Sequence, residues 1–224
     1  MAEGKSVLEL AYCEDGDMQR FFDIVSDAFG TEHEYFNMVF PKHETSEGRP
    51  PAGKRMLAMK KADPNFHFLK VTDPATKEII GVAKWNIYDG VIPEEGGMGT
   101  TEFWENEEEA KYADHLYREY LIERRKKIKE SDGHICCLDI LAVDPKHHYR
   151  GAGRLLVDWG TKKADEMDVE SVVEASVYGR HLYETCGFKN IKFVTLQPPE
   201  NKKHRPMRQR FFWMVRPKTS QAST

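Results

Sequence analysis

The sequence lacks several features that would assign it quickly to a class of protein. It has four cysteines, Cys13, Cys136, Cys137 and Cys186, with no CxxC pair and no histidine at a spacing suited to zinc. This pattern argues against a disulfide framework and against a metal site, so we expect a reduced, cytoplasmic protein that binds no metal. No apolar run approaches the length of a membrane span, and residues 1–5 do not begin a signal peptide.

The chain also lacks a strong charge of either sign. Its 33 basic and 37 acidic residues give a net charge of −4, so no global field points to nucleic acid or to a membrane, and we expect neither as a partner. With 40% hydrophobic and 31% charged residues, the composition is that of a globular protein. A chain of 224 residues buries one good core, which predicts a single domain over 1–217 and a disordered tail at 218–224.

Apolar periodicity predicts strands and helices that alternate along the chain. The expected strands are 6–13, 66–72, 79–88, 134–143, 171–176, 188–196 and 209–216. The expected helices are 15–30, a short helix within 31–51, 54–62, 104–129, the segment from the glycine turn to 168, and 179–187. This order predicts an α/β fold with a mixed central sheet of about seven strands and helices on both faces. The basic end of the 104–129 helix, from Arg124 to Lys129, is expected to be a solvated helix end, with a partner or localisation patch as the alternative.

The most informative local feature is the stretch "HHYRGAGRLL", residues 147–156, directly after the strand 134–143. A strand that runs into Gly-x-Gly and then a helix is typical of phosphate binding, because the first N–H groups of the helix have no internal partners. The third glycine of a dinucleotide motif is replaced by Leu156, and the lysine motif of a P-loop is absent. The glycine turn on its own fits a purely structural turn equally well.

Two longer segments give the turn a family context. "LAVDPKHHYRGAGRLLVDWG", residues 141–160, resembles the acetyl-CoA-binding segment of the GNAT N-acetyltransferase superfamily, with its pattern [Q/R]-x-x-G-x-[G/A]. "EASVYGRHLYETCGF", residues 174–188, resembles the second family segment, which ends in Leu-Tyr-x-x-x-Gly-Phe. "IIGVAKW", residues 79–85, is similar to the third strand of the family, and Val-Asp-Pro and Glu-Ala-Ser are closest to its fungal branch.

The resemblance implies the GNAT fold and acetyl-CoA as co-substrate, with the diphosphate over the glycine turn and the pantetheine arm along residues 141–143. The implied cofactor-binding residues are Leu141, Ala142, Val143, His148, Tyr149, Arg150, Gly151, Ala152, Gly153, Arg154, Ser176 and Tyr183. His148 stands where the family usually has Gln or Arg, and Ser176 replaces the Asn of many members. The side chains of Arg150 and Arg154 either contact phosphate or remain solvated.

Transfer of an acetyl group from a thioester to an amine needs a neutral amine, a stabilised oxyanion and a proton for the departing thiolate. The family uses direct attack, so Cys136 and Cys137 are expected in the core rather than as nucleophiles. The resemblance implies that Tyr183 is the general acid and that a backbone N–H near Leu141 polarises the carbonyl.

Two carboxylates are candidates for the catalytic base. Asp139 is the sole charge in the otherwise apolar strand 134–143, and strand alternation puts it on the face of Cys137 and Leu141. A structural ion pair is an equally good interpretation of Asp139, because an unpaired buried carboxylate is costly. Glu174, at the end of the next strand, is the second candidate.

Aromatic residues of the less diagnostic segments are the candidates for the acceptor pocket, although such residues also suit a core. They are Phe29, His33, Tyr35, Phe36, Trp85 and Tyr88, together with Phe211 and Trp213. The sequence therefore predicts an N-acetyltransferase that acts on a primary amine of a small molecule through a ternary complex. A protein or peptide N-acetyltransferase and a non-catalytic CoA-binding module are the alternatives, and the protein is expected to be a monomer or a homodimer.

Overall fold

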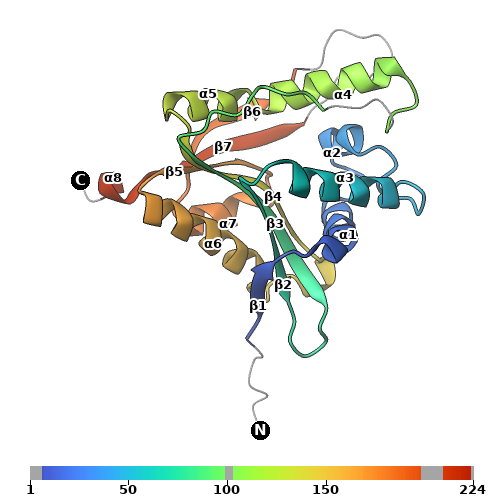
Figure 1. Cartoon of the computed structure of the whole chain (residues 1–224), viewed down its shortest axis with the longest axis horizontal. Coiled ribbons are helices and arrows are strands. Elements are labelled where there is room, and N and C mark those ends of the chain that lie inside the picture. The colour runs from blue at the N-terminus through green and yellow to red at the C-terminus, as the bar shows by residue number, and fades with distance from the viewer. Residues whose placement is uncertain (1–6, 99–102, 198–208, 223–224) are drawn as a thin grey trace.

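The computed structural model describes residues 7–98, 103–197 and 209–222 (Figure 1). The strands are β1 (Glu9–Tyr12), β2 (Phe66–Thr72), β3 (Ile79–Asp89), β4 (His134–Val143), β5 (Glu170–Ala175), β6 (Lys189–Thr195) and β7 (Arg210–Arg216). The α-helices are α1 (Met18–Phe29), α2 (Glu34–Val39), α3 (Arg49–Ala62), α4 (Glu107–Tyr120), α5 (Ile122–Glu130), α6 (Ala152–Met167), α7 (Arg180–Thr185) and α8 (Thr219–Ala222). Short 3₁₀ turns precede α1 (Asp15–Asp17) and α6 (Pro145–His147).

The strands form one mixed sheet in the order β1-β2-β3-β4-β5-β7-β6. Only β4 and β5 are parallel neighbours, and the other adjacent pairs are antiparallel. The crossover between the two parallel strands is α6, as a parallel pair requires. The predicted seven-stranded mixed sheet with flanking helices is confirmed.

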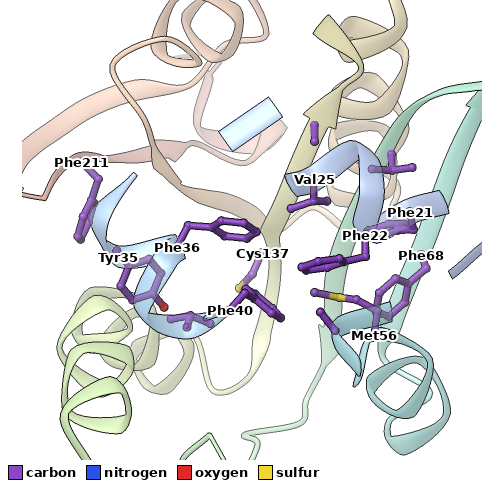
Figure 2. Packing of buried hydrophobic residues seen from close by; sticks show 14 of the residues in the cluster. Phe21, Phe22, Val25, Tyr35, Phe36, Phe40, Met56, Phe68, Cys137 and Phe211 are labelled. Carbon is purple, nitrogen blue, oxygen red and sulfur yellow. The ribbon is translucent and has the colours of Figure 1, made fainter. Parts of the chain in front are cut away.

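Helices cover both faces of the sheet and bury a separate apolar cluster on each. Helices α1 and α3 lie on one side of the sheet, and α6 and α7 lie on the other (Figure 1). The α1 side buries residues such as Phe21, Phe22 and Phe68 among many aromatic side chains (Figure 2). The α6 side buries Trp85 and Leu156. The sheet is therefore apolar on both faces, and a charged group within it needs a partner.

One glycine decides how closely α6 packs on the sheet. A Cβ atom at Gly160 would lie 2.1 Å from Cε2 of Trp85, whose ring is completely buried. The indole Nε1–H of Trp85 also donates to the carbonyl of Leu156 at 3.1 Å. These contacts place α6, and with it the glycine turn that starts this helix, against the centre of the sheet.

Two segments differ from the sequence-based prediction. The helix expected over 104–129 is two helices, because the chain bends at Leu121, which has φ −91° and ψ 1°. Residues 219–222 of the tail expected to be disordered form α8, where Thr219 donates to Asp165 and the Ser220 N–H donates to Asp168. Most of the loop expected between β6 and β7 lies outside the described residues.

The described cysteines are all free and buried, including Cys136 and Cys137 in β4. Among the described residues, no helix combines the length and the apolar character needed to cross a bilayer. Nor do three metal-ligating side chains gather anywhere in that part of the chain.

Candidate active site

The two parallel strands separate halfway along their length. The register between β4 and β5 ends at the pair Leu138 and Val173, whereas β4 continues to Val143. From residue 140 to 143, β4 therefore pairs only with β3 among the described strands. The backbone edge that faces β5 is free to bind an extended ligand in the way a further strand would.

A β-bulge lies at the point of separation. The register with β3 pairs Trp85 with Leu138 and Lys84 with Ile140, so that Asp139 is the extra residue of β4. A bulge bends its strand and redirects side chains. Here it opens the gap between β4 and β5.

The bulge also corrects a prediction about side-chain faces. Cys137 packs in the cluster on the α1 side, whereas Leu141 packs against the cluster on the α6 side. The expectation that Asp139 shares a face with both residues is therefore wrong for Leu141. The extra residue at the bulge reverses the regular alternation of the strand.

Four charged side chains meet beside the bulge, and we refer to Lys84, Arg124, Asp139 and Glu174 as the ion cluster. Arg124 Nε donates to Glu174 Oε1 at 3.1 Å, and Nη2 donates to Glu174 Oε2. Nη1 donates to Asp139 Oδ1, and Lys84 Nζ donates to Asp139 Oδ2 at 2.6 Å. Arg124 Nη2 also donates at 3.0 Å to the carbonyl of Leu138, the last β4 residue paired with β5.

The ion cluster is almost entirely removed from solvent, and it separates the pKa values of its two carboxylates. The Arg124 and Glu174 side chains are 4% and 0% exposed, against 23% for Asp139. Burial alone disfavours the charge of Asp139, but Lys84 and Arg124 outweigh it and hold the pKa of this carboxyl well below its usual range. Burial, the largest influence on Glu174, raises the pKa of that carboxyl despite Arg124.

A cleft opens between the separated strands and holds about 490 Å³ of unfilled space, part of it open to solvent. Its lining residues come from the ends of the strands, α1, the start of α2, α4, α7 and the start of β7. They are Phe29, His33, Tyr120, Leu138, Asp139, Leu141, Val173, Glu174, Ser176, Tyr183, Gln209, Arg210 and Phe211. Both candidate bases and the candidate acid therefore line one cleft.

The aromatic residues predicted for the acceptor pocket divide into two groups. Phe29 and His33 line the cleft, as does Phe211. Tyr35 stacks behind Tyr120 with ring centroids 4.4 Å apart. The others are buried in the two apolar clusters and do not line the cleft: Phe36, Trp85, Tyr88 and Trp213.

Sequence reasoning missed the residue that joins the two candidate bases. The Arg124 side chain was expected at a solvated helix end, yet it is buried in contact with both carboxylates. Nothing in the run "ERRKKIKE" separates Arg124 from Arg125 or Lys126, because its burial depends on the bend at Leu121. Tyr120 and Gln209 were also missed, since neither belongs to a motif.

Tyr183 extends from α7 into the cleft. Its side chain is only 6% exposed, and burial raises the pKa of its hydroxyl well above the usual value for tyrosine. Among the described residues, no group forms a hydrogen bond with this hydroxyl. Its oxygen is also not completely enclosed by those residues. Tyr183 therefore contributes a protonated phenol to the lining of the cleft. Ser176, beside it, accepts the N–H of Gly179 through its hydroxyl at 3.1 Å.

The glycine turn presents bare backbone at the start of α6. Gly151 is the N-cap with φ +94°, a left-handed conformation that side chains disfavour, and Tyr149 has φ +61°. In the described part of the chain, no acceptor pairs with the N–H groups from His148 to Arg154. A run of unpaired N–H groups at a helix N-terminus binds anions.

The polar side chains of the turn are already engaged within the protein. Arg150 Nη2 pairs with Asp73 Oδ2 at 2.6 Å, and Arg154 Nε pairs with both carboxylate oxygens of Asp158. The ring of His148 donates through Nε2 to the carbonyl of Val143 at 3.2 Å. These side chains hold the shape of the turn, and the backbone supplies its unsatisfied donors.

Comparison with known proteins places this geometry in a family. The model described as the acetyltransferase (GNAT) family matches residues 31–188. The structure of mosquito arylalkylamine N-acetyltransferase like 5b gives a TM-score of 0.63 at 16% identity, covering 94% of this chain and 99% of the other. Arylalkylamine N-acetyltransferase 2 from Aedes aegypti gives 0.62 at 15% identity, with coverages of 93% and 98%.

A third solved structure carries a different substrate in its name. The Drosophila melanogaster polyamine N-acetyltransferase, which catalyses the formation of N-acetylagmatine, gives a TM-score of 0.62 at 12% identity, with coverages of 93% and 98%. At these identities the likeness shows a shared fold. Comparison with curated proteins gives no match.

The ion cluster makes a prediction about stability. Replacement of Arg124→Met leaves two buried carboxylates without their shared partner, so we expect the free energy of unfolding to fall by about 3–5 kcal/mol. Urea denaturation at pH 7 measures this loss. Arg118→Met is the matched control, because Arg118 is 47% exposed and pairs with Asp114 on the same helix. It should cost much less than Arg124→Met, because an exposed ion pair contributes little to stability. Equal losses in the two variants would contradict the assigned role of Arg124.

Proposed function

The chain belongs to the acetyltransferase (GNAT) family, and from its cleft we propose that it acetylates a primary amine of a small molecule by direct transfer in a ternary complex. The family consists of N-acetyltransferases with acetyl-CoA as the donor, so the protein is an acyltransferase. The observation that supports the proposal best is the continuity of the glycine turn, the unpaired edge of β4 and the cleft containing Tyr183.

Acetyl-CoA fits both the glycine turn and the free edge of β4. The N–H groups from His148 to Arg154 would bind the diphosphate of acetyl-CoA, and Gly151 and Gly153 let it approach the backbone. The pantetheine amides would pair with the free edge of β4 along residues 141–143. This geometry directs the thioester toward the point of strand separation, where the cleft begins. A backbone N–H near Leu141 would then stabilise the oxyanion.

Tyr183 has the properties of a general acid. Its buried phenol stays protonated at neutral pH and has no partner among the described residues. As the amine nitrogen bonds to the carbonyl carbon and the carbon–sulfur bond breaks, the phenol proton passes to the departing thiolate. A non-catalytic CoA-binding module would have no use for an unpaired hydroxyl at this position.

Glu174 is the better candidate for the base that takes the proton of the amine, directly or through water. A base must gain a proton readily, and the two carboxylates differ in this respect because the pKa of Glu174 is raised and that of Asp139 is lowered. Asp139 would remain ionised as the counter-charge of Lys84 and Arg124. The fungal-type origin, the cytoplasmic location and the choice between monomer and homodimer stay predictions.

Binding of the donor tests the first half of the proposal. A saturating concentration of acetyl-CoA, about 100 times its Kd, should stabilise the protein by about 2.7 kcal/mol and raise its melting temperature. S-acetylpantetheine at the same concentration serves as the control, because it carries the thioester and the amides but no diphosphate. The proposed diphosphate site at the glycine turn is refuted if acetyl-CoA leaves the melting temperature unchanged or raises it no more than the control does.

Replacement of Tyr183→Phe tests the acid. The hydroxyl is lost while the ring still packs on Phe188, so kcat should fall about 100-fold or more with an unchanged Kd for acetyl-CoA. Release of free thiol during incubation with amines measures the rate. Tyr178→Phe removes the same group from a 97% exposed tyrosine in the preceding loop and should keep full activity. Full activity in Tyr183→Phe would remove Tyr183 from its role.

The pH dependence of kcat distinguishes the two carboxylates. If Glu174 accepts the proton, kcat should rise with pH through its raised pKa and fall again only in the alkaline range, where Tyr183 ionises. In Glu174→Gln, the rise of kcat at acidic pH should disappear, and kcat should be about 100-fold or more lower. Asp139→Asn removes one charge from the same ion cluster, and the rise of kcat at acidic pH should remain in this variant. The opposite result would make Asp139 the base.

A further inference from the structure

The charges around the floor of the cleft cancel. Lys84 and Arg124 carry two positive charges, Asp139 and Glu174 carry two negative ones, and each carboxylate oxygen accepts a hydrogen bond from one of the cations. Among the described residues that line the cleft, the only other formally charged side chain is the cationic Arg210. An acceptor with a second ammonium group would lose water on entry and meet no uncompensated carboxylate.

The walls of the cleft are aromatic and held in place. Tyr120 meets Phe211 with ring centroids 4.9 Å apart and is backed by the stacked ring of Tyr35. Phe29 stacks on Phe36 at 4.7 Å. Tyr35 and Phe211 lie at the same end of the buried cluster in Figure 2. Such a wall favours an apolar or ring-bearing ligand. Burial of its apolar surface is favourable, and no charge has to be removed from water.

Two neutral polar side chains of the cleft lining, His33 and Gln209, lie next to one another. His33 Nδ1 accepts the N–H of Phe36 at 3.1 Å and so caps α2. Burial lowers the pKa of His33 to about 4, so the ring is neutral at pH 7 and its single proton is on Nε2. This Nε2 lies 3.3 Å from the side-chain nitrogen of Gln209, which donates to the carbonyl of Arg210 at 3.4 Å. The pair recognises a hydroxyl or carbonyl better than a charge.

We propose that the acceptor is a primary monoamine on an apolar, ring-bearing body that ends in an uncharged hydrogen-bonding group, read by His33 and Gln209. This inference rests on the proposed function and names the substrate class of the same site. Polyamines and guanidine-bearing amines are poor acceptors, although a protein of the same fold carries a polyamine in its name. Gln209 is then a residue that determines specificity.

A panel of four amines tests the substrate class with acetyl-CoA held at saturation and thiol release as the readout. The amines are phenethylamine, its 4-hydroxy derivative, spermidine and agmatine. We expect both ring-bearing monoamines to exceed both polycations in kcat/KM by about tenfold or more, the factor equivalent to 1.4 kcal/mol. The 4-hydroxy compound should exceed phenethylamine about three- to tenfold, which is the net contribution of one hydrogen bond.

Two substitutions at one position separate charge from hydrogen bonding. Gln209→Leu removes the amide and should abolish the preference for the hydroxyl without improving spermidine or agmatine. Gln209→Glu keeps the size but adds a carboxylate outside the ion cluster, and should raise kcat/KM for agmatine about tenfold. Both variants should keep the wild-type response of the melting temperature to acetyl-CoA, which shows that they are folded and bind the donor.

The outcomes separate this inference from the proposed function. If spermidine or agmatine is the best acceptor of the wild-type protein, the enzyme is an amine acetyltransferase and the inference is overturned. A hydroxyl preference that survives Gln209→Leu overturns the role of the pair. If acetyl-CoA stabilises the protein but none of the four amines releases thiol, the proposed small-amine function fails together with the substrate class.

Discussion

The cleft depends on one buried guanidinium. Arg124 donates to Glu174 on β5, to Asp139 in the bulge of β4, and to the carbonyl of Leu138, where the two strands cease to pair. Two carboxylates next to one another in an apolar sheet would repel, and removal from water makes each still more costly. The planar fork of arginine satisfies both at once with a fixed geometry that a lysine does not offer. The strands can therefore separate at this point without leaving either buried carboxylate unpaired.

The bulge and the turn act on the two ends of the same gap. At Asp139 the extra residue bends β4 and reverses its alternation, so that Leu141 reaches the cleft from the α6 side. At Gly151 the left-handed backbone starts α6 with its first N–H groups unpaired. Because Gly160 lets this helix lie directly on Trp85, the proposed diphosphate site at the start of α6 is held in place against the centre of the sheet. A donor bound at the turn is thereby aligned with the free edge of β4.

The features that sequence reasoning predicted are those encoded in short stretches of chain. The glycine turn and the segment around Tyr183 each lie within about fifteen residues. Local apolar patterns also indicated seven strands, including the largely exposed edge strands β1 and β6. Asp139 was ambiguous because its partners, Lys84 and Arg124, come from distant segments. No periodicity marks a bulge, and no composition marks which arginine of a basic run turns inward. Only contacts between distant segments of the chain decide where the bulge forms and which arginine is buried.

The balanced charge of the ion cluster has a chemical consequence for the proposed reaction beyond selectivity. An amine can attack a thioester only in its unprotonated form, and an excess of negative charge in the cleft would stabilise the ammonium form that cannot react. Since Lys84 and Arg124 cancel both carboxylates, the cleft removes water from the amine without stabilising its positive charge. Burial then raises the pKa of Glu174, which can accept the proton, while Asp139 retains its charge. In the proposed reaction, the ion cluster would favour the reactive form of the amine and supply an acceptor for its proton.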